Sequence, residues 1–421
     1  MLLIGSFGSQ LCFGVFLKPL VDEFGWSRAA ASGAMSLMMG VSGLIGVLMG
    51  RLTDRYRART VIAVGTVVGA SAFFLLSRMD SLWQFYLYFG VGGGICVGSS
   101  YTPVSATVSK WFTKRRSLAL GIALMGIGVG QMILSPVSEL IISTAGWRTA
   151  YIVLAAAVLV CALPALIVMG RRPPSAASRA VEPGGGQVSV AVPRPQGMAT
   201  TEAARTAPFW MLMWTGLVIS AGFYIVAAHI VPAATDVGIS SSAAALILTV
   251  SSFGGLFGTV TAWVITVRLG NRITLLLLIL GEAVGMFLFI VTKSAWSFYV
   301  VALIFGFSFG GASPVRQGMV PPLFGLRAVG SILGLAFLAW SIGGIAGPYM
   351  AGLIFDSSGD YRLAFVIGGV LLVAGVVSVY LFGSHGDVSR RQEADPWEER
   401  RERRKGPGDE KRTTLTGEGP K

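Results

Sequence analysis

The chain has 421 residues, of which 53% are hydrophobic and only 13% are charged, and its formal net charge is +13. This composition is typical of integral membrane proteins and excludes an ordinary soluble domain. The three cysteines lie singly in apolar segments without metal-ligand spacing, and no phosphate-binding loop or zinc motif occurs. The sequence therefore predicts neither a metal site nor a cofactor.

Twelve mostly apolar runs follow one another along the chain. Each is long enough to cross the roughly 30 Å of bilayer hydrocarbon as a helix. The predicted spans are 2–20, 29–49, 60–77, 82–110, 117–143, 147–169, 208–235, 241–266, 273–292, 296–322, 328–355 and 361–383. We therefore predict an all-α membrane protein, whose even number of spans places both termini on one side of the membrane.

The basic residues indicate which side that is. Most of the 33 lysines and arginines lie in alternate connections, which are 50–60, 110–117, 170–206, 267–272 and the tail from 384. The opposite connections carry only Lys18, Arg28, Arg78, Arg148, Lys293 and Arg362. The positive-inside rule then predicts cytoplasmic termini in a plasma membrane, the inner membrane of a bacterium. Since the positive charge follows topology, we predict no nucleic-acid partner.

Composition also divides the chain. Residues 170–206 are rich in Pro, Gly, Ser and Ala without helical periodicity, which predicts a cytoplasmic linker between two six-helix halves, 1–169 and 207–383. Residues 384–421 mix many basic and acidic residues without an apolar period, which predicts a disordered cytoplasmic tail.

The two halves resemble each other at an offset of about 213 residues. The matched pairs include Pro19 with Pro232, Gly25 with Gly238, Ser27 with Ser240, Arg55 with Arg268 and Arg59 with Arg272. Parallel repeats of this kind are a feature of secondary transporters. By the same register the first span is about one turn shorter than the seventh, so we expect that the sequence begins after the true start.

The segment GRLTDRYRAR after the second span resembles the loop signature of the major facilitator superfamily, with Gly50, Asp54 and Arg55 at signature positions. The resemblance implies that superfamily's fold, in which two six-helix halves rock around a central cavity. It also implies that these three residues take part in gating, where Asp54 would hold a neighbouring helix end in one state and release it in the other. A solvated loop that merely follows the charge rule is the alternative. Because Val267 occupies the matching position of the second half, the gate is expected on one side only.

A narrower resemblance covers most of the chain. The segments FGVFLKPLVDEFGWSRAAAS, GWRTAY and AHIVPAATDVGIS are similar to bacterial members of the monocarboxylate porter and oxalate/formate antiporter branch. The resemblance implies transport of small carboxylates such as lactate, pyruvate, formate or oxalate, often with a proton or in exchange for another anion. One departure is Thr259, which stands where that branch often has an arginine.

Arg316 lies inside the tenth apolar run, where a guanidinium costs about 2.5 to 3.5 kcal/mol unless something compensates its charge. The resemblance places the tenth helix beside the central cavity, so Arg316 can contact a substrate carboxylate through its planar fork. Two alternatives stay open. The side chain can reach the inner membrane surface, or it can pair with backbone carbonyls near Pro314.

His229 is the histidine predicted inside the membrane, three residues before Pro232. With an unperturbed pKa near 6.5 a histidine can carry a proton or donate to an anion, although a hydrogen-bonded core histidine is an equal alternative. The further candidates for substrate contact, each of which can instead be packing, are Gln10, Tyr101, Gln131, Tyr224, Ser252 and Trp340. Glu282 lies in the ninth span, which is expected to be peripheral, and is predicted to be protonated or paired there.

Together these features predict a secondary transporter of a small organic anion, with protons as possible co-substrate and the lipid bilayer as surroundings. An exporter of amphipathic drugs or metabolites is the alternative, favoured by Thr259 and by the aromatic content. A membrane sensor is disfavoured because no signalling domain is recognisable. An enzyme is disfavoured because no nucleophile and base pair is recognisable.

Overall fold

The computed structural model describes residues 1–421 with the exception of 56–57, 112–115, 169–196, 326–327 and 383–421. The predicted tail and most of the predicted linker therefore lie outside the described residues. The division of the chain at that linker stays a prediction. Below, "first half" denotes residues 1–168 and "second half" denotes residues 207–382.

The described residues form a helical bundle in which the only strand-like pairing is a bridge between Gly197 and Gly325. The helices of the first half are α1 (Leu2–Leu11), α2 (Phe13–Phe24), α3 (Arg28–Arg55), α4 (Ala58–Leu76), α5 (Leu82–Phe85), the π-helix η1 (Tyr86–Gly93), α6 (Gly94–Trp111) and α7 (Arg116–Val168). After the short α9 (Thr200–Ala203), the second half comprises α10 (Ala207–Asp236), α11 (Ser241–Phe289), α12 (Ala295–Gly318), α13 (Val320–Phe324), α14 (Val329–Ser358) and α15 (Arg362–Phe382). A helix satisfies its backbone within itself, which lipid requires. The all-α prediction is confirmed.

Nine helices of the described residues are long and apolar enough to cross a membrane, compared with twelve predicted spans. Two of them, α7 and α11, each contain two spans, because positive-φ glycines break them at Gly146 (φ 82°) and Gly270 (φ 78°). The predicted span 82–110 is divided among α5, η1 and α6 and is not among the nine. The nine long helices and the twelve predicted spans therefore differ only in where the helices are divided. Every predicted span corresponds to helical residues.

The repeat in the sequence recurs in the backbone. Gly25 and Gly238 follow the first and seventh spans and both have positive φ, at 66° and 92°. Gly146 and Gly359 open the sixth and twelfth spans, with φ of 82° and 76°. Side chains repeat too. Ser27 Oγ accepts a hydrogen bond from the Ala30 amide, and Ser240 Oγ accepts one from the Ala243 amide, so corresponding serines cap the second and eighth spans.

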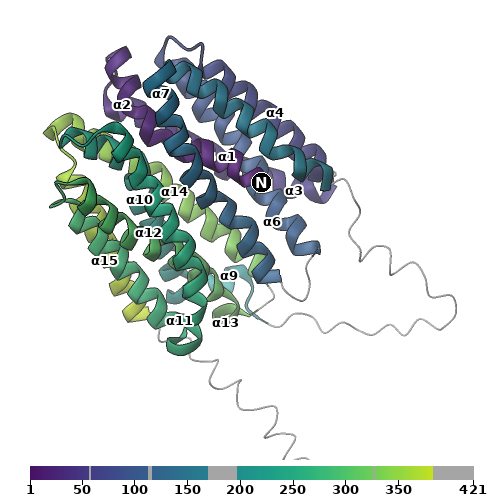
Figure 1. Ribbon diagram of the computed structural model, residues 1–421. Coiled ribbons are helices and arrows are strands. Elements are labelled where there is room, and N and C mark those ends of the chain that lie inside the picture. The colour runs from purple at the N-terminus through teal and green to yellow at the C-terminus, as the bar shows by residue number, and fades with distance from the viewer. Residues whose placement is uncertain (56–57, 112–115, 169–196, 326–327, 383–421) are drawn as a thin grey trace, which may run out of the picture.

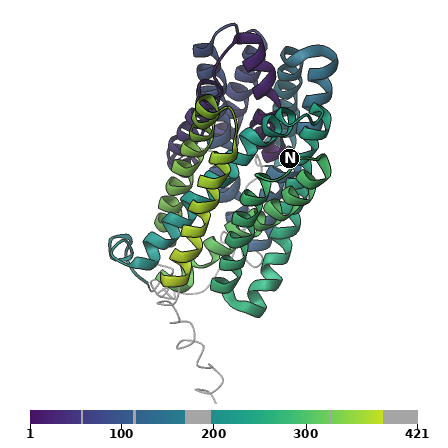
Figure 2. The same cartoon turned by 90° about the vertical axis from the view of Figure 1, so that its left-hand side faces the viewer.

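The helices run side by side along one long axis, as both views show (Figures 1 and 2). The two halves meet through close helix pairs, α2 with α10 and α3 with α14. Small residues permit these approaches: a Cβ on Gly14 would lie 2.6 Å from the Ala227 carbonyl oxygen, and one on Gly352 would lie 2.6 Å from Ala29 Cα. These contacts lie toward one end of the bundle, which we call the remote end. It carries the junctions 25–27, 237–240 and 359–361.

The approach at Gly352 yields a first prediction. Gly352→Ala should push α14 away from α3 and lower the free energy of unfolding by about 1 to 3 kcal/mol, because the obstructing atoms are backbone and cannot rotate away. Gly334→Ala on the same helix is the control, since a Cβ there meets nothing within 4 Å and the gain in helix propensity is the same. Thermal unfolding in detergent measures both, and equal stabilities would contradict the close-packing account.

Candidate functional site

Arg316 lies in the last turn of α12 and is only 4% exposed. Its Nη1 donates a hydrogen bond of 3.2 Å to the Leu212 carbonyl oxygen of α10, while its Nε has no hydrogen-bond partner within the described residues. Gly216 permits this approach, because a Cβ there would stand 2.7 Å from Nη1. The side chain is therefore directed to a neighbouring helix within the bundle. It neither extends to the surface nor bonds to the carbonyls near Pro314.

Two other predicted residues lie near this guanidinium, and two more adjoin them. Arg316 Cζ lies 6.0 Å from the centre of the Trp340 ring on α14, and Tyr101 on α6 is within its electrostatic reach. Tyr224 on α10 lies beside both Trp340 and Gln10 of α1. Gln10 donates through Nε2 to Met39 Sδ at 3.2 Å, and its Oε1 has no hydrogen-bond partner among the described residues. We call Gln10, Tyr101, Tyr224, Arg316 and Trp340 the central cluster; both halves contribute to it.

Aromatic rings extend the central cluster in two directions. Phe309 lies 5.8 Å from Trp340 and stacks on Phe223 at 3.9 Å with an interplanar angle of 9°. On the other side, Tyr101 of the first half stacks on Phe337 of the second half at 5.5 Å. The sequence analysis did not single out these three phenylalanines, because their spacing along the helices matches that of ordinary packing residues.

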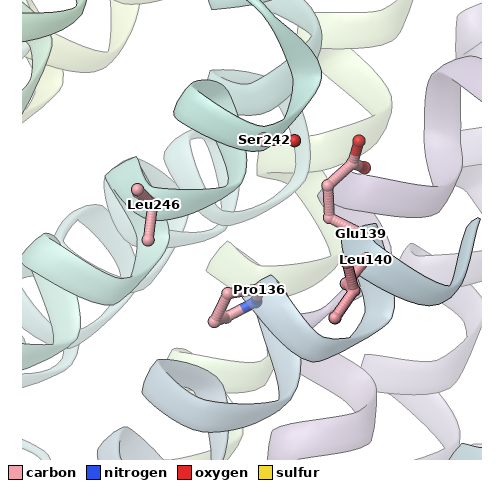
Figure 3. A pocket seen from close by; sticks show the side chains of 5 residues that line it. All are labelled: Pro136, Glu139, Leu140, Ser242 and Leu246. Atoms are coloured by element: carbon pink, nitrogen blue, oxygen red, sulfur yellow. The ribbon is translucent and has the colours of Figure 1, made fainter. Parts of the chain in front are cut away.

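Gln131 and Ser252 lie apart from the central cluster. Ser252 Oγ donates to Gln131 Oε1 at 2.8 Å, and both side chains are buried, so the pair joins α7 of the first half to α11 of the second. A pocket of about 220 Å³ opens farther along the same two helices. Figure 3 shows it between Pro136, Glu139 and Leu140 of α7 and Ser242 and Leu246 of α11. None of the predicted substrate-contact residues lines this pocket.

At the remote end, a network centred on Arg28 of α3 joins the two halves. Arg28 donates through Nη1 and Nη2 to the two carboxylate oxygens of Asp236 on α10, at 2.6 and 3.0 Å, and through Nη1 to the Tyr361 hydroxyl at 2.7 Å. Its guanidinium also lies 3.7 Å from the centre of the Phe355 ring. Asp356 of α14 accepts from the amides of Arg28 and Ala29, both at 2.9 Å, and so caps α3 from the opposite half.

His229 belongs to this network and not to the central cluster. It is fully buried on α10, with Nδ1 3.1 Å from the Tyr361 hydroxyl and Nε2 2.9 Å from the Pro348 carbonyl oxygen. Nε2 is also 3.2 Å from Ser32 Oγ on α3, which is a contact across the halves. Its predicted contact with substrate stays a prediction.

The repeat equivalent of Asp236 has different partners. Glu23 and Asp236 are equivalent positions at the 213-residue offset. Glu23, however, pairs within its own half, because it accepts hydrogen bonds from Trp147 and, at 2.6 Å, from Arg148. Asp236 reaches Arg28 across the halves, where Ser241 is the repeat equivalent of Arg28. A comparison of the two repeats for unequal charges would have singled out Arg28, which the sequence analysis treated only as a loop charge.

For two other predictions the described residues show no supporting contact. The last turns of α3 contain Gly50, Asp54 and Arg55. Their side chains lie outside the described residues, so the predicted gate stays a prediction. Glu282 is fully buried on α11, and neither carboxyl oxygen has a hydrogen-bond partner in the described part of the chain. Its predicted pairing is therefore not seen among those residues.

Comparisons with known proteins agree with this architecture. The profile of the Major Facilitator Superfamily matches residues 1–233 and 215–415. Monocarboxylate transporter 13 of Rattus norvegicus is 28% identical over 372 residues, covering 88% of this chain and 83% of the relative. Monocarboxylate transporter 11 of Homo sapiens is 26% identical, covering 88% and 78%. The uncharacterized MFS-type transporter YcxA of Bacillus subtilis is 25% identical, covering 86% and 88%.

Among solved structures, a bacterial homologue of the human lysosomal transporter Spinster, inward-facing and occupied, superposes with a TM-score of 0.67. It is 17% identical, with 91% of this chain and 94% of that chain covered, so this likeness shows the fold alone. The comparisons confirm the predicted fold class and the resemblance to monocarboxylate transporters. The relatives are transporters and not enzymes.

The remote-end network yields a second prediction. Asp236→Asn should weaken the contact between the halves by about 1 to 3 kcal/mol, because Arg28 loses a charged partner at a site where only 10% of its side chain is exposed. Spin labels on exposed positions of the two halves, Ser143→Cys and Ser357→Cys, should then report a larger fraction of long distances.

The repeat supplies the control for this measurement. Glu23→Gln removes the equivalent carboxylate, which bonds only within the first half, and should leave the distance distribution unchanged. If Asp236→Asn and Glu23→Gln gave the same distribution as the parent, the network would not hold the halves together.

Proposed function

Because the chain belongs to the Major Facilitator Superfamily and its relatives are transporters, we propose that it is a secondary active transporter of a small organic anion. The chain is a multi-pass membrane protein by its family and its apolar helices. In the proposal, a mono- or dicarboxylate crosses the plasma membrane by alternating access, with both chain termini in the cytoplasm. Transport is coupled to protons or proceeds by exchange. The names of the relatives support a carboxylate as cargo.

The buried guanidinium of Arg316 is the observation that carries the proposal. It is 4% exposed, and within the described residues it forms no ion pair with a carboxylate. A buried charge without a partner is strongly unfavourable. One carbonyl and the face of Trp340 compensate it only in part, and its Nε has no acceptor among the residues that the structure describes. A carboxylate ligand would supply both the missing charge and the missing acceptor.

The position of Arg316 suits alternating access. It lies between α12 and α10 within the second half, while the central cluster around it includes Gln10 and Tyr101 of the first half. When the halves rock apart, a ligand on Arg316 would lose or gain the first-half contacts. The site would therefore differ between the two states, which a carrier needs if the ligand is to influence the transition.

The two ends of the bundle would gate this site. In the proposed topology the remote end faces outward, so the Arg28 and Asp236 pair closes the outer side in the conformation described here. Asp54, with Gly50 and Arg55, is the proposed counterpart at the cytoplasmic end. His229 is the candidate proton carrier, since it contacts Tyr361 of the network and Ser32 of the opposite half.

An exporter of amphipathic compounds is the second candidate. The rings of Phe223, Phe309 and Phe337 favour it, because these partly exposed apolar side chains adjoin the central cluster. The two functions differ in what they require of Arg316. A carboxylate carrier needs its charge, whereas an exporter of uncharged or cationic compounds would be hindered by it.

The third prediction separates these functions. In proteoliposomes loaded for counterflow, Arg316→Lys should weaken the apparent affinity for pyruvate or another transported carboxylate, because an ammonium offers a point charge in place of a bidentate fork. Arg316→Gln should nearly abolish it, a loss of about 2 to 5 kcal/mol for a desolvated pair.

Arg78→Gln, which removes an exposed charge two residues after the end of α4, is the matched control and should transport like the parent. Membrane levels of all variants are measured in parallel, so that failed insertion is recognised. Equal affinities for the parent and both Arg316 variants would refute the role of Arg316 in anion binding.

A further inference from the structure

The free edge of the Arg316 guanidinium determines how a ligand can approach. Of its three nitrogens, Nη1 is engaged by the Leu212 carbonyl oxygen and faces the backbone at Gly216, where a Cβ would lie 2.7 Å away. Nε has no partner among the described residues. Nε is also buried, so the edge formed by Nε and Nη2 is the one left for a ligand that enters when the halves move apart. It presents two roughly parallel N–H groups, which match the two oxygens of one carboxylate.

The charge of the central cluster limits the ligand to one negative charge. The cluster contains Arg316 and the uncharged side chains of Gln10, Tyr101, Tyr224 and Trp340, and no second lysine or arginine of the described residues belongs to it. A second carboxylate on the ligand would have to lose its water without a matching cation, which is unfavourable. The site thus favours a monocarboxylate over a dicarboxylate.

The rings beside Arg316 differ from the aromatic core of the first half. Phe13, Phe73, Phe85 and Phe89 also pack against one another, but each is at most 2% exposed, so they only fill space. Phe223, Phe309, Phe337, Trp340 and Tyr101 are all partly exposed. They therefore retain apolar surface that a ligand can cover, close to a buried guanidinium that forms no ion pair within the described residues.

We propose that Trp340 and Phe309 determine specificity, and that the site selects monocarboxylates bearing an aromatic ring, the arylacetate class. The carboxylate lies on the Nε and Nη2 edge of Arg316, and the ring of the ligand packs against Trp340 and Phe309, which are 5.8 Å apart. Rings favour offset or tilted partners, and such pairs add to the gain from burying the ring. This inference rests on the proposed function and names its substrate class.

Binding of radiolabelled phenylacetate and propionate to the purified full-length protein tests the proposal by equilibrium dialysis, with succinate as competitor. Phenylacetate should bind at least about tenfold more tightly than propionate, since burial of its ring adds apolar area. Succinate should compete no better than propionate.

Variants locate the preference. Trp340→Leu and Phe309→Leu should lower the affinity for phenylacetate more than that for propionate, and so reduce the advantage of phenylacetate to about threefold or less, whereas Trp340→Phe should retain most of it. Trp296→Leu is the control, because that tryptophan is 74% exposed at the start of α12. A merely structural role of Trp340 would instead lower the affinity for both ligands together.

The outcomes separate the two proposals. Equal affinities for phenylacetate and propionate, both lost in Arg316→Gln, would overturn the aryl specificity and leave the anion carrier intact. Tighter binding of succinate would do the same. Failure of every carboxylate to bind the parent protein would overturn the proposed function and this inference together.

Discussion

A positive charge buried in an apolar bundle needs a counter-charge or hydrogen-bond acceptors, and Arg316 has only part of this compensation. One backbone carbonyl and the face of an indole accompany its guanidinium, while its Nε is left without an acceptor in the described part of the chain. In water this would cost little, but a desolvated guanidinium without a counter-charge is strongly destabilising. The other features of the site follow from this constraint. Gly216 admits the side chain, the Trp340 ring lies beside it, and Phe309 adjoins that ring.

The same principle operates at the remote end with the opposite result. The charge of Arg28 is compensated there, because its guanidinium donates to Asp236 and to the Tyr361 hydroxyl and lies over the Phe355 ring. Because every one of these partners lies in the other half of the chain, the compensated cation holds the halves together, whereas the incompletely compensated cation inside is the proposed ligand site. A carrier needs both kinds of site, since its ends must close by interactions between the halves while the interior can still bind a ligand.

Much of the architecture could be predicted from sequence, because its causes are local. Apolar length gives the spans, and the match of Gly25 with Gly238 and of Ser27 with Ser240 anticipates turns and caps that the backbone repeats. The depth of Arg316 was also predictable from its place in an apolar run. Its partner was not, because Leu212 contributes a carbonyl that any residue could provide. The pair of Arg28 with Asp236 and the rings of Phe309 and Phe223 depend on how helices distant in sequence face each other, and helical periodicity does not encode that.

A contact between the carboxyl carbon of a ligand and the guanidinium of Arg316 is the central claim, and solid-state NMR measures it directly. Protein labelled with ¹⁵N in its arginine side chains is reconstituted with a monocarboxylate labelled with ¹³C at the carboxyl carbon. The account predicts a dipolar coupling between that carbon and an arginine Nε at hydrogen-bonding distance, present in the parent protein and absent in Arg316→Gln. A coupling that persists in Arg316→Gln, or a bound ligand without any coupling to arginine, would contradict it.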